Sequence, residues 1–236
     1  MIKCCFCNIP TDKINNCKFN VCNKCGLYIN IPMSQEEILN KNRNFLLSAC
    51  KKDPFNNARI DEALDVQMKT LIEFSGIKNG KVFDVGAASG FFMYAAKLCG
   101  WEADGNEISE AAIKWVKSNY NIDIRYGFVE YLDLPNDYYD AVVLWNTLEH
   151  TYNPKITLMK CRDILKFNGL LYIKVPNKIT INELNTFYER VHLYEFTTNC
   201  LHNNLAKLGF KKIFIKIVET ARPGLLAAVY LYRKGN

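Results

Sequence analysis

Asp84-Val-Gly-Ala-Ala-Ser-Gly90 is the stretch of sequence that decides the fold. It follows segment 80–83, which predicts a buried strand, and it precedes the apolar segment 92–98, which predicts a helix ending at Gly100. Glycines between a strand and a helix let a ligand approach the backbone closely. Glu107, 23 residues after Asp84, ends the next predicted strand with a carboxylate suited to the two hydroxyls of a ribose. The series therefore predicts a nucleoside-binding half-site.

The chain alternates between strand and helix patterns after residue 78. Predicted strands cover 81–85, 101–105, 122–126, 140–145, 170–175, 211–218 and 225–232, and predicted helices cover 90–99, 109–119, 154–167 and 197–208. Ser109 and Asn153-Pro154 are typical helix starts. The alternation predicts an α/β fold with a doubly wound, mostly parallel, seven-stranded sheet. Because no helix separates the last two strands, they are expected to form a terminal antiparallel hairpin at or near one edge.

Six of the ten cysteines lie within the first 25 residues. Two C-x-x-C turns, Cys4-x2-Cys7 and Cys22-x2-Cys25, each direct two thiolates at one centre, and together they complete a tetrahedral sulfur site. Four sulfur ligands leave no open position, so the predicted metal is structural zinc. Iron in a rubredoxin-like site and reduced cysteines without metal are the alternatives, and the extra Cys5 and Cys17 leave the ligand set open.

Three regions follow from these patterns. Residues 1–30 are predicted to form a zinc-ribbon-like module, 31–77 a mainly helical connector that covers the ligand site, and 78–236 the main α/β domain. A segment of about 30 residues has too little core to fold by itself, and metal binding would supply the missing free energy.

Composition limits the class of protein. The chain is 49% hydrophobic and 13% aromatic, which indicates a filled globular core. Its 30 basic and 24 acidic residues give a net charge of +6, and the basic residues are scattered, so nucleic acid is not the expected partner. The sequence has neither a secretory signal pattern nor an apolar run of membrane-spanning length, so no membrane association is expected. With ten cysteines, this favours a reducing, cytoplasmic location.

The glycine spacing argues against a dinucleotide site. Gly86 and Gly90 are spaced G-x-x-x-G, whereas the dinucleotide fingerprint is G-x-G-x-x-G. Ala88 occupies the second glycine position, and a bulky side chain occupies the third. An NAD site is therefore disfavoured.

Segment 84–90 resembles motif I of the class I S-adenosylmethionine-dependent methyltransferases. Later segments match the same family in order: 105–109, 138–150, 153–154, 165–169 and 175–177. The resemblance covers about residues 55–236. Some members of this family that modify sugars and other small metabolites begin with a similar cysteine module followed by a glycine. The resemblance does not extend to the large C-terminal domain of the sugar C-methyltransferases, so membership of that subgroup is not expected.

The resemblance implies S-adenosylmethionine as cofactor. The glycine turn would face its methionine portion, Asp84 would anchor that turn and the amino group, and Glu107 would accept from both ribose hydroxyls. Segment 128–129 would pack on adenine, and segment 145–146 would meet the methionine end. The implied cofactor contacts are Asp84, Gly86, Ala87, Ala88, Gly90, Phe91, Glu107, Ile108, Phe128, Val129, Trp145 and Asn146.

Two positions keep an alternative. Many relatives carry an acid where Phe128 stands, so the contact to the adenine amino group would fall to Glu130 or to backbone groups. Phe128 and Trp145 are equally compatible with a role as core aromatics.

An oxygen acceptor needs a base to remove its proton, and histidine titrates in the useful range. His192 and His150 are the candidate catalytic bases, while His202 falls within a predicted helix and is expected to be structural. A polar histidine with satisfied hydrogen bonds is the alternative for the first two. Asn177, Tyr188 and Arg190 are candidate acceptor contacts.

The leading functional hypothesis is O-methylation of a small molecule: a sugar, a nucleotide-sugar or a related metabolite of surface-glycan synthesis. An rRNA or tRNA methyltransferase that grips RNA with its zinc module is the first alternative. A non-enzymatic scaffold that binds the cofactor and recruits a partner is the second.

Overall fold

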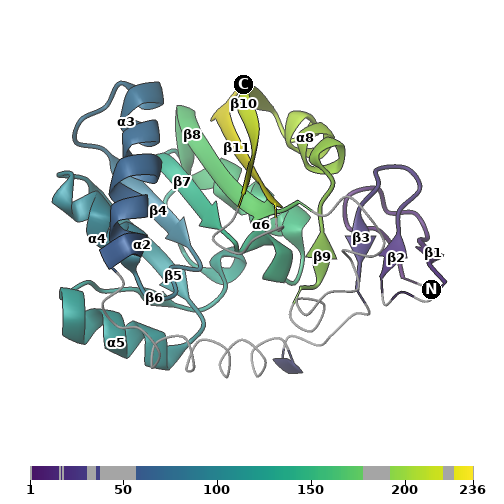
Figure 1. Ribbon diagram of the computed structural model, residues 1–236, viewed down its shortest axis with the longest axis horizontal. Coiled ribbons are helices and arrows are strands. Elements are labelled where there is room, and N and C mark those ends of the chain that lie inside the picture. The colour runs from purple at the N-terminus through teal and green to yellow at the C-terminus, as the bar shows by residue number, and fades with distance from the viewer. Residues whose placement is uncertain are drawn as a thin grey trace.

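The computed structural model describes residues 2–15, 17, 19–30, 36–37, 57–177, 192–219 and 226–235 (Figure 1). Within these residues the main sheet has seven strands in the order β10-β11-β8-β7-β4-β5-β6. Their bounds are β10 (Phe210–Glu219), β11 (Leu226–Lys234), β8 (Leu165–Pro176), β7 (Tyr139–Trp145), β4 (Lys81–Val85), β5 (Glu102–Glu107) and β6 (Arg125–Tyr126).

The topology confirms the predicted fold class. Strands β8, β7, β4, β5 and β6 are parallel neighbours, and β11 pairs antiparallel with both β8 and β10. The hairpin of β10 and β11 therefore forms one edge of the sheet, as the missing helix between these strands predicts.

Helices cover both faces of the sheet. They are α2 (Asn57–Glu62), α3 (Lys69–Ser75), α4 (Phe91–Leu98), α5 (Glu110–Tyr120), α6 (Pro154–Ile164) and α8 (Thr198–Lys207), with the π-helical η1 (Ala63–Met68) joining α2 to α3. Short 3-10 turns are η2 (Val129–Tyr131) and η3 (Leu148–His150). Ser109, Asn153 and Thr197 cap α5, α6 and α8 by accepting from backbone amides.

Alternation along each strand divides the core. Val82 and Val143 point to the face that η1, α3 and α4 cover, whereas Phe83 and Val142 point to the face that α6 and α8 cover. Figure 1 shows the second face turned toward strands β1 to β3 of the cysteine module.

Two predicted boundaries are wrong. The helix predicted over 154–167 ends at Ile164, because Leu165 already pairs with Tyr139 as the first residue of β8. Of the strand predicted over 122–126, only Arg125–Tyr126 pairs with β5. The remaining apolar residues of that segment, Ile122 and Ile124, are buried under α4 and α5 instead. Most of the predicted connector before residue 57 lies outside the described residues.

A second sheet joins the N-terminal strands to a strand from the later part of the chain. Its order is β1 (Asp12–Lys13), β2 (Asn20–Val21), β3 (Tyr28–Ile29) and β9 (Tyr194–Glu195). The first three strands belong to the cysteine module, while β9 precedes α8 of the main domain (Figure 1). The module therefore shares both a sheet and a hydrophobic core with the α/β domain. In the part of the chain described, no helix has the length and apolar character needed to cross a membrane.

Candidate functional site

The glycine turn and the end of β5 are tied together by one carboxylate. Glu107 is 4% exposed, and its Oε2 accepts from the backbone amide of Ala88 at 2.9 Å. Its Oε1 accepts from the amides of Ile108 at 2.6 Å and Ser109 at 2.9 Å. A carboxylate offers about four acceptor positions, so these three donors leave one open. Glu107, the residue predicted to bind the ribose, thus lies against the predicted glycine turn.

Gly86 is required by its surroundings. Its φ of 73° is a left-handed conformation, and a Cβ at this position would lie 2.6 Å from Cγ2 of Thr147. Ala88 also has a positive φ, 47°, which turns its amide toward Glu107. Gly90 (φ 68°) packs closely on α5, where a Cβ on this glycine would lie 2.8 Å from Cγ1 of Val116. The turn is therefore shaped by close packing on both sides.

Asp84 is a buried acid beside a second buried acid. Burial, and secondarily the negative charge of Glu107, raise the pKa of Asp84 to about 7. Burial also raises the pKa of Glu107, while the three backbone amides that it accepts from oppose this shift. Two carboxylates in one desolvated region are stabilised by a positive charge placed near them. The site is therefore suited to a cationic ligand that also carries hydroxyls.

The predicted adenine region lies after β6. Val129 is buried in the core, and Phe128 is half-buried with its ring 6.3 Å from that of Tyr131. Glu130 accepts a short hydrogen bond from Thr157 of α6. Glu130 therefore has a hydrogen-bond partner on α6 instead of being oriented for the predicted contact with adenine. Ile108 and Phe91 are both half-buried, at the starts of the segments that follow β5 and the glycine turn.

The end of β7 supplies Trp145 and Asn146. Trp145 is half-buried; its ring packs edge-on to Tyr172 at 5.2 Å and lies under Nζ of Lys174 at 4.8 Å. Asn146 is exposed at a φ of 54°, and its amide donates to the backbone oxygen of Lys174 at 2.9 Å. The structure thus gives Trp145 packing partners, and its predicted cofactor contact stays a prediction.

Both candidate bases meet in one cluster. The rings of His150 and His192 have centroids 4.8 Å apart, and Nδ1 of His192 lies 2.7 Å from Oε1 of Glu195. Glu149 contributes a carboxylate 4.0 Å from Nε2 of His150. His192, Glu195 and Glu149 are 3%, 1% and 1% exposed. This histidine cluster can exchange a proton, and the ligand atoms of Glu149, His150 and His192 are also close enough to hold a cation.

The other predicted acceptor-side residues lie in different settings. Asn177 is buried and its Oδ1 accepts from Thr198 at 3.2 Å, a contact that fixes the start of α8. Tyr188 and Arg190 lie outside the described residues. His202 lies on α8, with Nδ1 2.6 Å from the hydroxyl of Tyr232, as expected for a structural histidine.

Sequence reasoning missed Glu195 and Asn30. Glu195 stands three residues after His192, a spacing that could have indicated the pair. Asn30 donates from Nδ2 to the backbone oxygen of His192 at 3.0 Å, across 162 residues. A local sequence pattern cannot predict a contact between residues so far apart in the chain.

The four predicted metal ligands come together. The Sγ atoms of Cys4, Cys7, Cys22 and Cys25 all lie within 4.8 Å of one another, and those of Cys4 and Cys25 are 3.6 Å apart. Tetrahedral zinc with bonds of about 2.3 Å would separate its sulfurs by about 3.8 Å. The donor set and its spacing therefore fit a structural zinc ion.

Two further thiols, those of Cys5 and Cys200, lie next to this cluster. Hydrogen bonding to Cys200 of α8, and then to Cys4, raises the pKa of Cys25. Contacts with Cys25, and then with Cys5, lower the pKa of Cys4. The cysteine cluster therefore lies directly against the first turn of α8 in the main domain.

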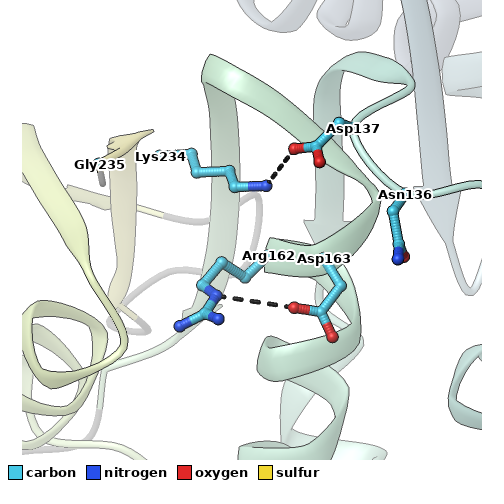
Figure 2. A pocket seen from close by; sticks show the side chains of 6 residues that line it. All are labelled: Asn136, Asp137, Arg162, Asp163, Lys234 and Gly235. Carbon is cyan, nitrogen blue, oxygen red and sulfur yellow. Dashed lines mark hydrogen bonds and ion pairs between the residues drawn. The ribbon is translucent and has the colours of Figure 1, made fainter.

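A surface hollow lies away from all these groups. Figure 2 shows Lys234 paired with Asp137 at 2.7 Å and Arg162 with Asp163 at 3.7 Å. The hollow is lined by Asn136, Asp137, Arg162, Asp163, Lys234 and Gly235. It lies near the start of β7, whereas the glycine turn follows the end of the parallel strand β4, and its charges pair with one another. It therefore offers no alternative site.

Known proteins resemble this chain in sequence and fold. Residues 57–213 match the family described as a methyltransferase domain. A probable S-adenosylmethionine-dependent methyltransferase of Mycolicibacterium smegmatis is 30% identical over 92 residues, 36% of this chain and 36% of that protein. A ubiquinone biosynthesis O-methyltransferase of Bradyrhizobium diazoefficiens is 28% identical over 103 residues, 42% of this chain and 40% of that protein. The chain thus spans less than half the length of these curated relatives.

Solved structures agree on the fold. A SAM dependent methyltransferase from Archaeoglobus fulgidus superposes with a TM-score of 0.59 at 20% identity, covering 76% of this chain and all of that one. The YcgJ protein of Bacillus subtilis gives a TM-score of 0.61 at 14% identity, covering 74% of this chain and 99% of that one.

Proposed function

Since this chain belongs to the methyltransferase domain family, which its residues 57–213 match, we propose that it transfers the methyl group of S-adenosylmethionine to an oxygen of a small acceptor. The observation that carries the proposal is Glu107, a buried carboxylate held against the glycine turn by the amide of Ala88. A ligand that fits there must accept close backbone packing and present hydroxyls to a carboxylate.

We assign the cofactor to the ends of β4 and β5, where the glycine turn and Glu107 lie. When bound, S-adenosylmethionine supplies a methyl group on a positively charged sulfur. Glu107 would take the ribose hydroxyls, and Asp84 would balance the positive charge of the amino group. The backbone at Gly86 would lie beside the methionine portion. The raised pKa of Asp84 supports this, because a cation nearby stabilises its ionised form.

The acceptor side is assigned to the histidine cluster. We infer that Nε2 of His192 takes the proton of the acceptor hydroxyl while the methyl group is transferred to its oxygen. Glu195, 2.7 Å from Nδ1, would hold the ring in one orientation and stabilise the protonated imidazole. His150 and Glu149 belong to the same cluster and would lie beside the acceptor. Because displacement at a methyl group needs alignment above all, the main contribution of these residues is positioning.

The cysteine module is assigned a structural zinc ion held by Cys4, Cys7, Cys22 and Cys25. The spacing of the sulfur atoms supports this metal, and four thiolates leave it no position for a substrate. The domain division 1–30, 31–77 and 78–236 remains our proposal for the chain's organisation.

For the acceptor we propose a sugar, a nucleotide-sugar or a related small metabolite. The ubiquinone O-methyltransferases among the relatives support oxygen as the acceptor atom. Scattered basic residues and a net charge of only +6 favour a small acceptor over RNA.

One experiment tests the assignment. Isothermal calorimetry of the zinc-loaded protein with adenosylhomocysteine should show binding, and labelled S-adenosylmethionine should then transfer label to a member of a sugar and nucleotide-sugar panel. Transfer of label to rRNA or tRNA, with affinity falling steeply as salt rises, would instead support an RNA methyltransferase. Binding of NADH without binding of adenosylhomocysteine would overturn the cofactor assignment.

A further inference from the structure

Strand β3 of the cysteine module pairs with a strand that lies next to the histidine cluster. Tyr28 is opposite Glu195 and Ile29 is opposite Tyr194 in an antiparallel register. The module therefore reaches into the segment that carries His192 through backbone pairing as well as through side-chain packing.

Asn30, the next residue of the module, makes two contacts with that segment. Its backbone amide donates to the oxygen of Leu193 at 2.9 Å, and its Nδ2 donates to the oxygen of His192 at 3.0 Å. A side-chain amide that binds the carbonyl of a residue limits where that residue's Cα can lie. Asn30 thus constrains the backbone of His192 itself.

The opposite side of the same segment is held by the main domain. The amide of Leu193 donates to the backbone oxygen of Glu149 at 2.9 Å, and the hydroxyl of Tyr194 donates to the backbone oxygen of Tyr152 at 3.0 Å. The segment from His192 to Glu195 therefore lies between the module and η3. Removing either support would therefore loosen the backbone that carries the imidazole.

The module can give this support only if it is itself ordered. The turn that carries Cys22 and Cys25 leads directly into β3. The backbone amide of Gly26 donates to the backbone oxygen of Cys22 at 2.7 Å, and the amide of Cys22 donates to the backbone oxygen of Leu27 at 2.9 Å. Asn30 follows Cys25 by five residues. Strands of two residues contribute few hydrogen bonds, so the cysteine cluster adds a further constraint on this turn beside the burial of Leu27 and Ile29.

We propose that the cysteine module is a positioning element of the active site: the metal-held turn fixes Asn30, and Asn30 fixes His192. Metal at the cysteines thereby controls the acceptor side of the site while leaving the cofactor side intact. The functional meaning of this coupling rests on the proposed role of His192, but the coupling itself can be measured separately. Asn30 is a positioning residue, not a catalytic one.

The chain offers a direct probe, because it contains three histidines. Carbon–proton NMR of the zinc-loaded protein labelled at histidine should give three ring signals, assigned with H150Q, H192Q and H202Q. Asn30→Asp keeps the side-chain shape and replaces the amide donor by a carboxylate that faces the oxygen of His192. It should shift and broaden the His192 signal and speed amide exchange at Leu193 by on the order of tenfold. Removing zinc with a chelator should produce the same His192 change.

The matched control is Asn20→Asp. It makes the same chemical change in β2, where Nδ2 of Asn20 donates to the hydroxyl of Thr11 at 3.3 Å and β3 separates this strand from β9. This variant should leave all three ring signals in place, and the His202 signal should stay unchanged in Asn30→Asp. An unchanged His192 signal in Asn30→Asp and after zinc removal would overturn the proposal.

Calorimetry with adenosylhomocysteine separates this inference from the proposed function. Equal affinity in wild type and Asn30→Asp, with an altered His192 signal, supports acceptor-side control. If Asn30→Asp lost cofactor affinity as well, the module would be a general support of the fold and the proposal would be wrong. Absence of binding in the wild type would contradict the cofactor assignment and leave the measured coupling in place.

Discussion

The amide of Ala88 lies 2.9 Å from Oε2 of Glu107, so the turn after β4 and the end of β5 are joined before any ligand is considered. Three backbone donors occupy the carboxylate, and about one acceptor position remains. A ribose with two hydroxyls would use the open position and take over one that a backbone amide now fills. Ligand binding and the conformation of the turn are therefore linked through one side chain.

Replacing Glu107 tests this link. Glu107→Gln should weaken adenosylhomocysteine binding by about 10- to 100-fold, because a charge-assisted acceptor is lost and an amide donor would face the amide of Ala88. Calorimetry measures the change. Glu102→Gln is the matched control, since Glu102 begins the same strand with an exposed side chain paired to Lys81. Equal weakening in both variants would show that the strand, and not the carboxylate, is responsible.

The buried Asp84 predicts the pH dependence of stability. An ordinary aspartate has a pKa of about 4, and burial raises that of Asp84 to about 7. Between pH 4 and pH 7 the folded protein therefore holds a proton that the unfolded chain releases. The free energy of unfolding of the ligand-free protein should fall as pH rises through this window, by at most about 4 kcal/mol. Chemical denaturation at several pH values measures it, and Asp84→Asn should flatten the profile.

The same group predicts how cofactor affinity varies with pH. A cationic ligand favours ionised Asp84, so binding below pH 7 must expel a proton. Affinity for S-adenosylmethionine should rise with pH up to about pH 7, at most about tenfold per pH unit, and then level off. An affinity that falls over this range would contradict the placement of positive charge near Asp84.

Two glycines with similar φ separate backbone strain from steric clash. Gly86→Ala should destabilise the fold by about 2 kcal/mol or more, because a Cβ would lie 2.6 Å from Thr147. Gly76→Ala, at φ 70° with open space around it, should cost only about 1 kcal/mol. Thermal unfolding measures both. Adding Thr147→Ala to Gly86→Ala should recover part of the loss, and no recovery would place the cost elsewhere.

If His192 is the base and Glu195 orients it, replacing either residue should reduce turnover. On an acceptor that the wild type methylates, His192→Gln should lower kcat by roughly 10²- to 10⁴-fold, the usual range for a lost general base. Glu195→Gln should lower it less, because the base remains but its orientation and charge balance suffer. His202→Gln is the control, since His202 lies on α8 and contacts Tyr232. Wild-type turnover in His192→Gln would remove this residue as the base.

Metal analysis should return about one zinc ion per chain, bound by four thiolates. The double variant Cys22→Ser/Cys25→Ser should lose it, whereas Cys99→Ser, outside the cluster, should keep it. X-ray absorption at the zinc edge should give sulfur neighbours at about 2.3 Å. A folded wild-type protein without metal would contradict the structural zinc.

The sequence predicts the parts of this site that are local. The glycine turn, Glu107 and the paired C-x-x-C turns are close in the chain, and their chemistry follows from residue type and spacing. Asn30 could not be found in this way, because its role depends on a contact across 162 residues. The helix end at Ile164 was missed for a related reason: Leu165 starts a strand only because Tyr139 is beside it.

The pairing of β3 with β9 also sets an order for folding. Asn30 and His192 are 162 residues apart, so the N-terminal module leaves the ribosome long before its fourth strand exists. During synthesis the edge of β3 stays open, and it can close only after most of the α/β domain has emerged. Early metal binding by the four thiols would keep β3 in a conformation that can pair with β9 once β9 has been synthesised. Zinc supply during translation is thus expected to affect the yield of assembled protein more than zinc added after folding.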